Sequence, residues 1–248
     1  MCGIAGICHL HRQAVPDLGP GLRAMNRLQK HRGPDGEGVW THPSGSLGFG
    51  HVRLSIIDIA GGHQPMTDAA GNWVSFNGEI YNYVELRQEL GLEQFRTTSD
   101  TEVLLAAYRR WGVDCVDHFR GMFAFALWEV GSQTLFCARD RLGIKPFYYF
   151  WDGKTFAFAS EIKALLEHPG IPTAFEDTIL SEYLAFGYIA SDQTMFRGIR
   201  KLMPGHWLRL QLDAGGPHFE VQRYWDITAS TGSSAPKSDD QWIAECRC

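Results

Sequence analysis

Three features are scarce or missing in this sequence of 248 residues, and each absence excludes a class of protein. No apolar run approaches the roughly 20 residues that a membrane-spanning helix needs. Positive charge is not in surplus: 23 Lys and Arg stand against 28 Asp and Glu, so no basic surface for nucleic acid is expected. The six cysteines are scattered, as expected for reduced thiols rather than a disulfide framework. We therefore expect a cytoplasmic protein that binds neither membrane nor nucleic acid.

What is present is an ordinary globular composition, with 44% hydrophobic and 21% charged residues and enough length for a sizeable core. Strand-like runs separated by Gly, Asp and Ser dominate the chain. Helices are predicted at 18–29, 83–90 and 101–111, and strands at 54–57 and 73–76 among others. This mixture predicts an α+β fold in which helices pack on the outer faces of sheets.

The second residue is the most informative one. Removal of Met1 would leave Cys2 at the N-terminus, with a thiol and a free α-amine on the same carbon. A thiolate is a strong nucleophile, and an α-amine with a pKa near ~7.7–8.0 accepts a proton at neutral pH. A nucleophile and a base in one residue is the N-terminal-nucleophile arrangement. Taken alone, Cys2 also fits an early residue of a first strand.

Three further positions carry polar groups suited to catalysis or binding. Asn77-Gly78 follows a short strand, and its side-chain amide and backbone N–H fit either an oxyanion hole or a hairpin turn. Arg53 lies in an apolar run and needs an anionic partner, which is either a substrate carboxylate or a structural Asp or Glu. Asp100 either caps the following helix or, where Ser99 is the cap, is free to face a substrate ammonium group.

Several sequence blocks occur in a fixed order along the chain. They are Met1-Cys2-Gly3-Ile4, His31-Arg32-Gly33-Pro34-Asp35-Gly36, Arg53-Leu54-Ser55-Ile56-Ile57-Asp58, Phe76-Asn77-Gly78-Glu79-Ile80-Tyr81-Asn82, Ser99-Asp100-Thr101-Glu102, Gly121-Met122-Phe123-Ala124-Phe125, Ala138-Arg139-Asp140-Arg141-Leu142-Gly143-Ile144-Lys145-Pro146 and Ala159-Ser160-Glu161-Ile162-Lys163-Ala164-Leu165. Together they resemble the glutaminase domain of glutamine-hydrolysing asparagine synthetases, a class II glutamine amidotransferase. The resemblance covers about residues 2–226.

The resemblance implies the four-layer αββα sandwich of N-terminal-nucleophile hydrolases. It also implies hydrolysis of L-glutamine to glutamate and ammonia through a thioester on Cys2. In this family pattern Cys2 is the nucleophile and its own α-amine is the base, while Asn77 and Gly78 form the oxyanion hole. The predicted chemistry therefore depends on these three residues.

The same resemblance implies a binding site for a free amino acid. Arg53 would hold the α-carboxylate of glutamine, and Asp100 with Glu79 would hold its α-ammonium group. The remaining implied residues line the pocket (Leu54, Ser55, Ile56 and Ile57) or support the nucleophile loop (Arg32 and Gly33).

The chain departs from this family in one respect. Asparagine synthetases pass ammonia to a second domain that activates aspartate with ATP and Mg through a Ser-Gly-Gly-x-Asp-Ser loop, and no such loop occurs here. Residues 2–226 are expected to form the amidotransferase domain, and 227–248 a linker and the truncated start of a missing synthetase domain. No cofactor or metal is expected for the glutaminase half. The expected partners are L-glutamine, the missing domain or a separate acceptor subunit, and a second copy, since homodimers are common in the family.

Two other interpretations stay open. An N-terminal-nucleophile amidase for a different amide would share Cys2, although the pair of Arg53 and Asp100 favours a free amino acid. A non-catalytic or partner-dependent regulatory fragment would retain the fold, although loss of Cys2 would be its usual sign. The aromatic segment 147–158 fits buried strands, or a face that the missing domain would cover.

Overall fold

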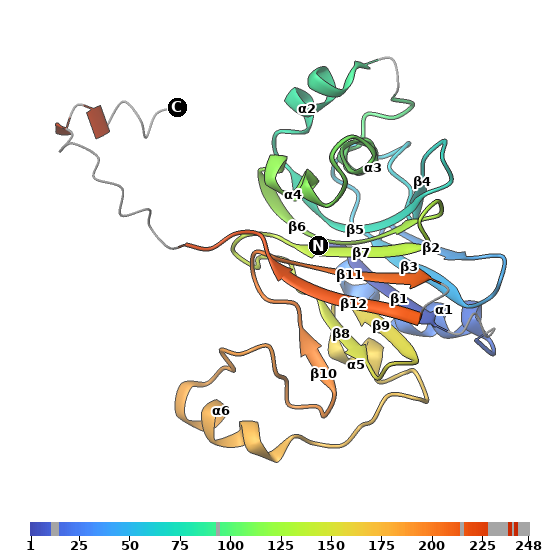
Figure 1. Cartoon of the computed structure of the whole chain (residues 1–248), viewed down its shortest axis with the longest axis vertical. Helices are drawn as coiled ribbons and strands as arrows, with labels where there is room; N and C mark the ends of the chain where they lie inside the picture. The colour runs from blue at the N-terminus through green and yellow to red at the C-terminus, as the bar shows by residue number, and fades with distance from the viewer. Residues whose placement is uncertain (11–14, 93–94, 214–215, 228–237, 240, 243–248) are drawn as a thin grey trace.

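The computed structural model describes residues 1–10, 15–92, 95–213, 216–227, 238–239 and 241–242. Within these ranges, two six-stranded antiparallel sheets lie face to face, and helices cover their outer faces (Figure 1). The strand orders are β10-β8-β9-β1-β3-β2 and β12-β11-β7-β6-β5-β4. The strands are β1 (Gly3–His9), β2 (Gly36–Thr41), β3 (Leu47–Arg53), β4 (Met66–Thr67), β5 (Trp73–Ile80), β6 (Gly121–Glu129), β7 (Thr134–Arg139), β8 (Tyr148–Trp151), β9 (Thr155–Ala159), β10 (Ile199–Lys201), β11 (His206–Asp213) and β12 (Gly216–Arg223). The helices are α1 (Leu18–Leu28), α2 (Tyr83–Leu90), α3 (Asp100–Trp111), α4 (Cys115–His118), α5 (Ile162–Leu165) and α6 (Leu180–Phe186), with 3₁₀ turns at Lys30–Arg32, Gly112–Asp114 and Asp177–Ile179.

The first sheet is buried on both faces, so its inner strands are apolar on both sides. In β1, Ile4 and Cys8 join the core between the sheets, whereas Ala5 and Ile7 pack in the layer under α1. Gly6 is required here, because a Cβ atom at this position would lie 2.2 Å from the ring of Phe158. β1 therefore packs tightly against its neighbour β9 at the centre of the molecule.

The second sheet is likewise buried on both faces. In β6, Ala124, Ala126 and Trp128 face the core between the sheets, and the residues between them face the layer formed with α2, α3 and α4. Alternation with period two places each side chain on one defined face. The layers therefore run helix, sheet, sheet, helix (Figure 1), which confirms the predicted α+β sandwich.

Several predicted elements are confirmed and one is wrong. The predicted helix at 83–90 coincides with α2, and the predicted helices at 18–29 and 101–111 coincide with α1 and α3 to within one residue. The predicted strand at 54–57 is a loop. Its backbone N–H groups are satisfied by side chains rather than by a neighbouring strand: Leu54 N–H donates to Cys2 Sγ, and Ser55 N–H donates to Asp35 Oδ2. These partners remove the reason for the segment to join a sheet.

Two other interpretations are settled by the structure. The hairpin turn at Asn77-Gly78 is wrong, because β5 runs without interruption from Trp73 to Ile80 and pairs with β6 along its whole length. The aromatic segment 147–158 contributes β8 and most of β9 to the first sheet, and its Phe147, Phe156 and Phe158 are all at 0% exposure. Most of the predicted linker at 227–248 lies outside the described residues.

Candidate active site

Cys2 lies directly before β1, and its side chain meets the loop that follows β3. Leu54 N–H donates to Cys2 Sγ at 3.3 Å, and the thiol lies 3.6 Å from Leu54 O as a donor. The backbone of Cys2 is also held, because Arg32 Nε donates to its carbonyl oxygen at 3.0 Å. Burial raises the pKa of the Cys2 thiol, and the Leu54 hydrogen bond opposes that rise. The sulfur is thus fixed in position and in contact with a backbone donor.

The turn that contains Arg32 and Gly33 supports this arrangement from outside the pocket. Arg32 Nη1 donates to Glu161 at 3.1 Å, so its guanidinium group joins the carbonyl of Cys2 to the segment after β9. Gly33 has no space for a side chain, because a Cβ atom there would lie 2.3 Å from the carbonyl carbon of Val52. The chain therefore passes close to the end of β3, where Asp35 N–H donates to Arg53 O at 2.9 Å.

Arg53 ends β3 and fixes the loop that follows it. Its Nη1 donates to Ile59 O at 3.0 Å, and its Nη2 donates to Ile57 O at 3.1 Å and to Asp58 O at 2.6 Å. The side chain is buried but lines the cavity beside Cys2. Of the predicted pocket residues, Leu54, Ile56 and Ile57 also line this cavity. The predicted pocket residue Ser55 lies outside its lining.

Asn77 presents an unusual side chain. It is 1% exposed, and in the described part of the chain neither Nδ2 nor Oδ1 has a hydrogen-bond partner. A buried amide without partners is costly, by about 1–3 kcal/mol. The side chain lines the same cavity as Cys2. A group kept in this state is suited to a ligand that supplies the missing hydrogen bonds.

The backbone N–H of Gly78 points to the edge of β5 that faces away from β6. Opposite Gly78 in β6 is Phe123, whose N–H and C=O are both bonded to Asp140 and so point away from β5. In an antiparallel ladder such a pair is not mutually hydrogen-bonded, so Gly78 N–H also points away from β6. A Cβ atom at Gly78 would lie 2.3 Å from Met122 O, so only glycine fits. Asn77 and Gly78 therefore provide two donors beside one cavity.

Asp100 occupies the first turn of α3 without capping it. Ser99 is the cap, since its Oγ accepts a hydrogen bond from Thr101 N–H at 3.1 Å. Asp100 Oδ2 instead accepts from Ile80 N–H at 3.1 Å, at the end of β5. Burial, together with the charge of the neighbouring Glu79, raises the pKa of Asp100 to about 6. Two carboxylates thus face one cavity, as a site for an ammonium group requires.

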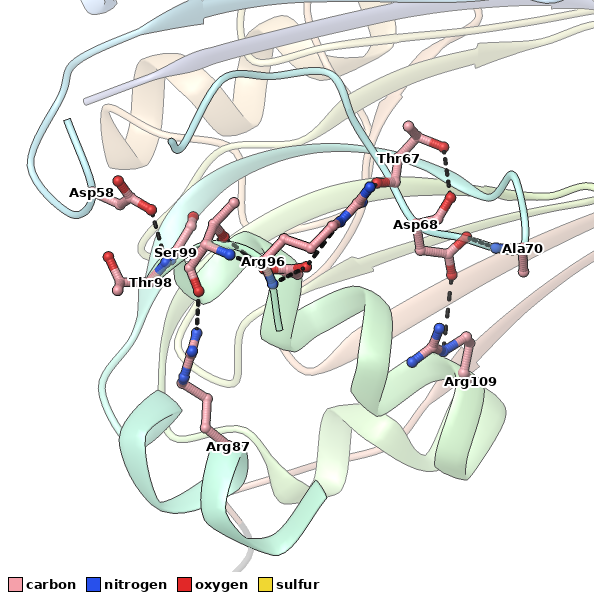
Figure 2. Close-up of polar contacts among 11 residues, drawn as sticks. Asp58, Thr67, Asp68, Ala70, Arg87, Arg96, Thr98, Ser99 and Arg109 are labelled. Atoms are coloured by element: carbon pink, nitrogen blue, oxygen red, sulfur yellow. Dashed lines mark hydrogen bonds and ion pairs between the residues drawn. The ribbon is translucent and has the colours of Figure 1, made fainter. Parts of the chain in front are cut away.

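The segment before α3 is fixed by contacts from three directions (Figure 2). Thr98 N–H donates to Asp58 Oδ2 at 2.8 Å, which joins this segment to the loop after β3. Arg87 Nη1 donates to Thr97 O at 2.7 Å, and Arg96 Nη2 donates to Thr67 O at 2.9 Å. These contacts hold Ser99 and therefore the start of α3 in place, so Asp100 is positioned by a rigid scaffold.

The cavity brings together most of the predicted site residues. Its volume is about 140 Å³, well below the roughly 300–1,000 Å³ of pockets for drug-sized ligands, so it suits a small ligand. The predicted residues that line it are Cys2, Arg53, Leu54, Ile56, Ile57, Asn77, Gly78, Glu79 and Asp100. Arg32 and Gly33, which were predicted as supporting residues, are not part of its lining.

Several residues that line the cavity are not among the predicted site residues, and Gln64 and Lys145 are two of them. Gln64 Oε1 accepts from Phe76 N–H at 2.7 Å, and its Nε2 donates to Thr101 Oγ1 at 3.2 Å, so it joins β5 to α3. Nothing in its sequence context marks it. Lys145 is 4% exposed and lines the cavity beside Cys2. It lies in the block Ala138–Pro146, and lysine is a residue type that is mostly exposed.

No three His, Cys, Asp or Glu side chains of the described residues come together in a way that would ligate a metal ion. None of the described helices has the length and apolar character needed to cross a bilayer.

The architecture and the position of the cysteine together define a class of protein fold. Two facing antiparallel sheets between helical layers, with a cysteine directly before an inner strand, are the fold of N-terminal-nucleophile hydrolases. The sequence profile of the glutamine amidotransferase domain matches residues 1–225, and the chain belongs to this family.

Known proteins agree with this assignment. The chain is 43% identical over 253 aligned residues to asparagine synthetase [glutamine-hydrolyzing] 3 of Bacillus subtilis, covering 100% of this chain and 40% of that protein. It is 39% identical over 217 residues to asparagine synthetase [glutamine-hydrolyzing] 1 of the same organism, covering 86% and 34%. The chain thus spans less than half the length of these relatives.

A solved structure supports the fold. The glutamine phosphoribosylpyrophosphate amidotransferase of B. subtilis, complexed with ADP and GMP, superposes with a TM-score of 0.61 at 20% identity. The match covers 90% of this chain and 49% of that chain. At this identity the likeness shows a shared fold.

Proposed function

We propose that this chain hydrolyses L-glutamine to glutamate and ammonia through a thioester on Cys2, after removal of Met1. The observation that carries this proposal is the Asn77 amide, which is buried, without partners and beside the same cavity as the Cys2 sulfur. Met1 also lines that cavity, so its removal both frees the α-amine of Cys2 and opens space for a substrate.

The proposed reaction begins with attack of the Cys2 sulfur on the side-chain amide carbon of glutamine. The α-amine takes the thiol proton and gives it to the leaving nitrogen, so that ammonia departs and a thioester remains. Asn77 Nδ2–H and Gly78 N–H stabilise the negative oxygen of the tetrahedral intermediate. Water then attacks the thioester, and glutamate is released.

Specificity for a free amino acid would come from three charged side chains. Asp100 and Glu79 carry the negative charge that an α-ammonium group needs. Arg53 keeps its Nε–H available for an α-carboxylate, because its hydrogen bonds to the loop use only the two terminal nitrogens. This arrangement favours a glutaminase over an amidase for an uncharged amide.

The first test is a substrate panel. Protein whose N-terminal Cys2 has been confirmed by mass spectrometry is incubated with L-glutamine, D-glutamine and N-acetyl-L-glutamine, and glutamate or ammonia release is measured. We expect turnover of L-glutamine, with kcat/KM on the order of 100-fold lower for the acetylated compound because Asp100 and Glu79 lose their charged partner. Comparable turnover of N-acetyl-L-glutamine would identify a different amidase. No turnover by folded protein would favour the non-catalytic alternative.

Asp100→Asn gives a second test, because it separates binding from stability. Loss of the carboxylate is expected to raise KM for L-glutamine about 10- to 100-fold, the value of one hydrogen bond to a charged group.

The pKa of Asp100 is about 6 in the folded protein, against roughly 3.9 when unfolded. A carboxyl with a raised folded pKa loses its stabilising contribution as pH rises through that pKa. The variant should therefore have a higher Tm than wild type at pH 7.

Thermal unfolding and kinetics at several pH values check this prediction. Wild type should gain stability as pH falls from about 6 toward 4, and its KM should rise over the same range as Asp100 is protonated. Asp100→Asn should show neither change. A variant with unchanged KM and a lower Tm would show that Asp100 is structural.

The released ammonia needs an acceptor, and the relatives indicate its class. Because the relatives are more than twice as long as their match to this chain, we propose that a synthetase domain, continuous with this chain or on a separate subunit, receives the ammonia. ATP and Mg would act only there. The apolar side chains of Tyr183, Leu184, Phe186 and Tyr188 are each more than 40% exposed, and such a surface supports contact with another protein.

A further inference from the structure

Lys145 is a buried cation at the cavity with no role in the reaction described above. It is 4% exposed, and among the described residues its Nζ has no hydrogen bond or ion pair. Lysine is almost never buried without a partner, because its charge is costly to desolvate. The cavity that it lines is the one that contains the Cys2 sulfur and the start of the chain. A positive charge in this position acts on the groups that titrate in the cavity.

The loop that carries Lys145 is firmly held. The carboxylate of Asp140 accepts hydrogen bonds from the N–H groups of Phe123, Leu142, Ile144 and Lys145 at 2.9–3.2 Å. Arg139 donates to the carbonyl oxygens that close the same loop, among them Lys145 O at 2.7 Å. The backbone at Lys145 is therefore fixed to β6 and β7, and its side chain cannot leave the cavity by a simple loop movement.

The other cations near Cys2 are already engaged. Arg32 pairs with Glu161 at 3.1 Å, and the terminal nitrogens of Arg53 donate to three carbonyl oxygens of the following loop. Lys145 also lines the cavity. In the described part of the chain, its ammonium group has no such partner.

Carboxylates also lie at or near this cavity, and two of them accept hydrogen bonds from backbone N–H groups. Asp35 is bound to Ser55 N–H at 2.8 Å and lies outside the cavity lining. Glu79 and Asp100 line the part of the cavity next to β5 and α3, where Asp100 is bound to Ile80 N–H. Of the two, Glu79 acts on the charge of Lys145 together with Cys2 and Asp140. Cys2 therefore shares Lys145 with one carboxylate at the cavity.

A positive charge here has the same effect on both groups of an N-terminal cysteine. With Met1 in place, burial lowers the pKa of the Met1 α-amine, the charge of Cys2 raises it, and Lys145 and Arg32 lower it. Burial raises the pKa of the Cys2 thiol, and the Leu54 hydrogen bond, the α-amine, Arg53 and Lys145 oppose that rise. The reactive form of an N-terminal cysteine carries one proton shared between amine and thiol, and it is lost when both are protonated. A nearby cation disfavours that doubly protonated form.

We propose that Lys145 is an electrostatic positioning residue of the N-terminal nucleophile, and that its ammonium group keeps Cys2 from holding a proton on both its sulfur and its α-amine at neutral pH. The proposal rests on the proposed function, because it assigns Lys145 to the proposed catalytic centre. It also predicts a property of Cys2 that is measurable without glutamine.

The experiment follows alkylation of Cys2 by iodoacetamide from pH 5 to 10, in Met1-free protein, with the N-terminal peptide quantified by mass spectrometry. Lys145→Met keeps a chain of similar length and removes the charge. We expect the apparent pKa of alkylation to rise by about one pH unit in this variant, which makes alkylation about tenfold slower below that pKa. The acid limb of kcat/KM for L-glutamine should move to higher pH by the same amount.

Three controls make the result specific. Lys145→Arg keeps the charge and should restore both profiles to within a few tenths of a pH unit, while Lys145→Gln serves as a second neutral variant. Lys154→Met removes an exposed lysine in the turn between β8 and β9 and should leave both profiles unchanged. An alkylation profile of Lys145→Met that matches wild type would overturn the proposal, as would a raised KM without any movement of the acid limb. If L-glutamine is not hydrolysed but the alkylation shift is present, the proposed function fails while the role of Lys145 stands.

Discussion

Cys2→Ala is expected to reduce glutamate release to background, a loss in kcat on the order of 10⁴-fold or more. Removing the sulfur eliminates the covalent intermediate, and none of the other described cysteines can replace it, because Cys8, Cys115 and Cys137 are buried away from the cavity. Arg53, Asp100 and Glu79 remain, so glutamine should still bind with a Kd close to that of wild type. Calorimetric titration of the inactive variant with L-glutamine measures this directly.

A chain with an uncleaved extension before Cys2 is the matched control. It keeps the thiol and the Leu54 contact but blocks the α-amine, so that the base is lost while the nucleophile remains. We expect it to be as inactive as Cys2→Ala, yet still to be alkylated at Cys2. Substantial activity in the extended chain would show that another group accepts the thiol proton, and the N-terminal-nucleophile mechanism would then be wrong for this protein.

The sequence predicts best the elements whose beginning and end are set by residues close to them in the chain. The helix at 83–90 and the helical stretch that α3 occupies have clear start and stop signals, and Ser99 acts as the cap that its position suggests. The loop at 54–57 was mistaken for a strand because its apolar residues fit the pattern. What keeps it out of a sheet is Cys2 and Asp35, which come from distant parts of the chain and leave no mark on the local sequence.

The same reasoning explains which site residues are readable from the sequence. Cys2 is marked by its place in the chain, and Asn77-Gly78 by a dipeptide of special chemistry. Lys145 has no such mark, since the loop after β7 meets the start of β1 only when the two sheets have packed face to face. Lys145 is recognised as unusual only once its burial and its lack of a partner are known.

The contrast between Asn77 and Asn72 gives the second large effect. Asn77→Ala removes one of two oxyanion donors and is expected to lower kcat by about 10²–10³-fold, with little change in KM. Because the amide makes no hydrogen bond in the described part of the chain, its loss should not lower Tm appreciably. Asn72 is also buried, but its amide donates to Asp68 at 3.1 Å and accepts from Val130 N–H at 3.1 Å.

Asn72→Ala should therefore show the opposite pattern, with a loss of roughly 1–3 kcal/mol in the free energy of unfolding and a nearly unchanged kcat. Denaturant unfolding and steady-state kinetics on both variants measure the two quantities independently. If Asn77→Ala lost stability while it kept kcat, the amide would be a structural group and the oxyanion assignment would fail. A loss of kcat in Asn77→Ala together with a loss of stability in Asn72→Ala would show that Asn77 serves the reaction and not the fold. A buried amide without partners destabilises the folded protein, and on this result its missing hydrogen bond forms only in the transition state.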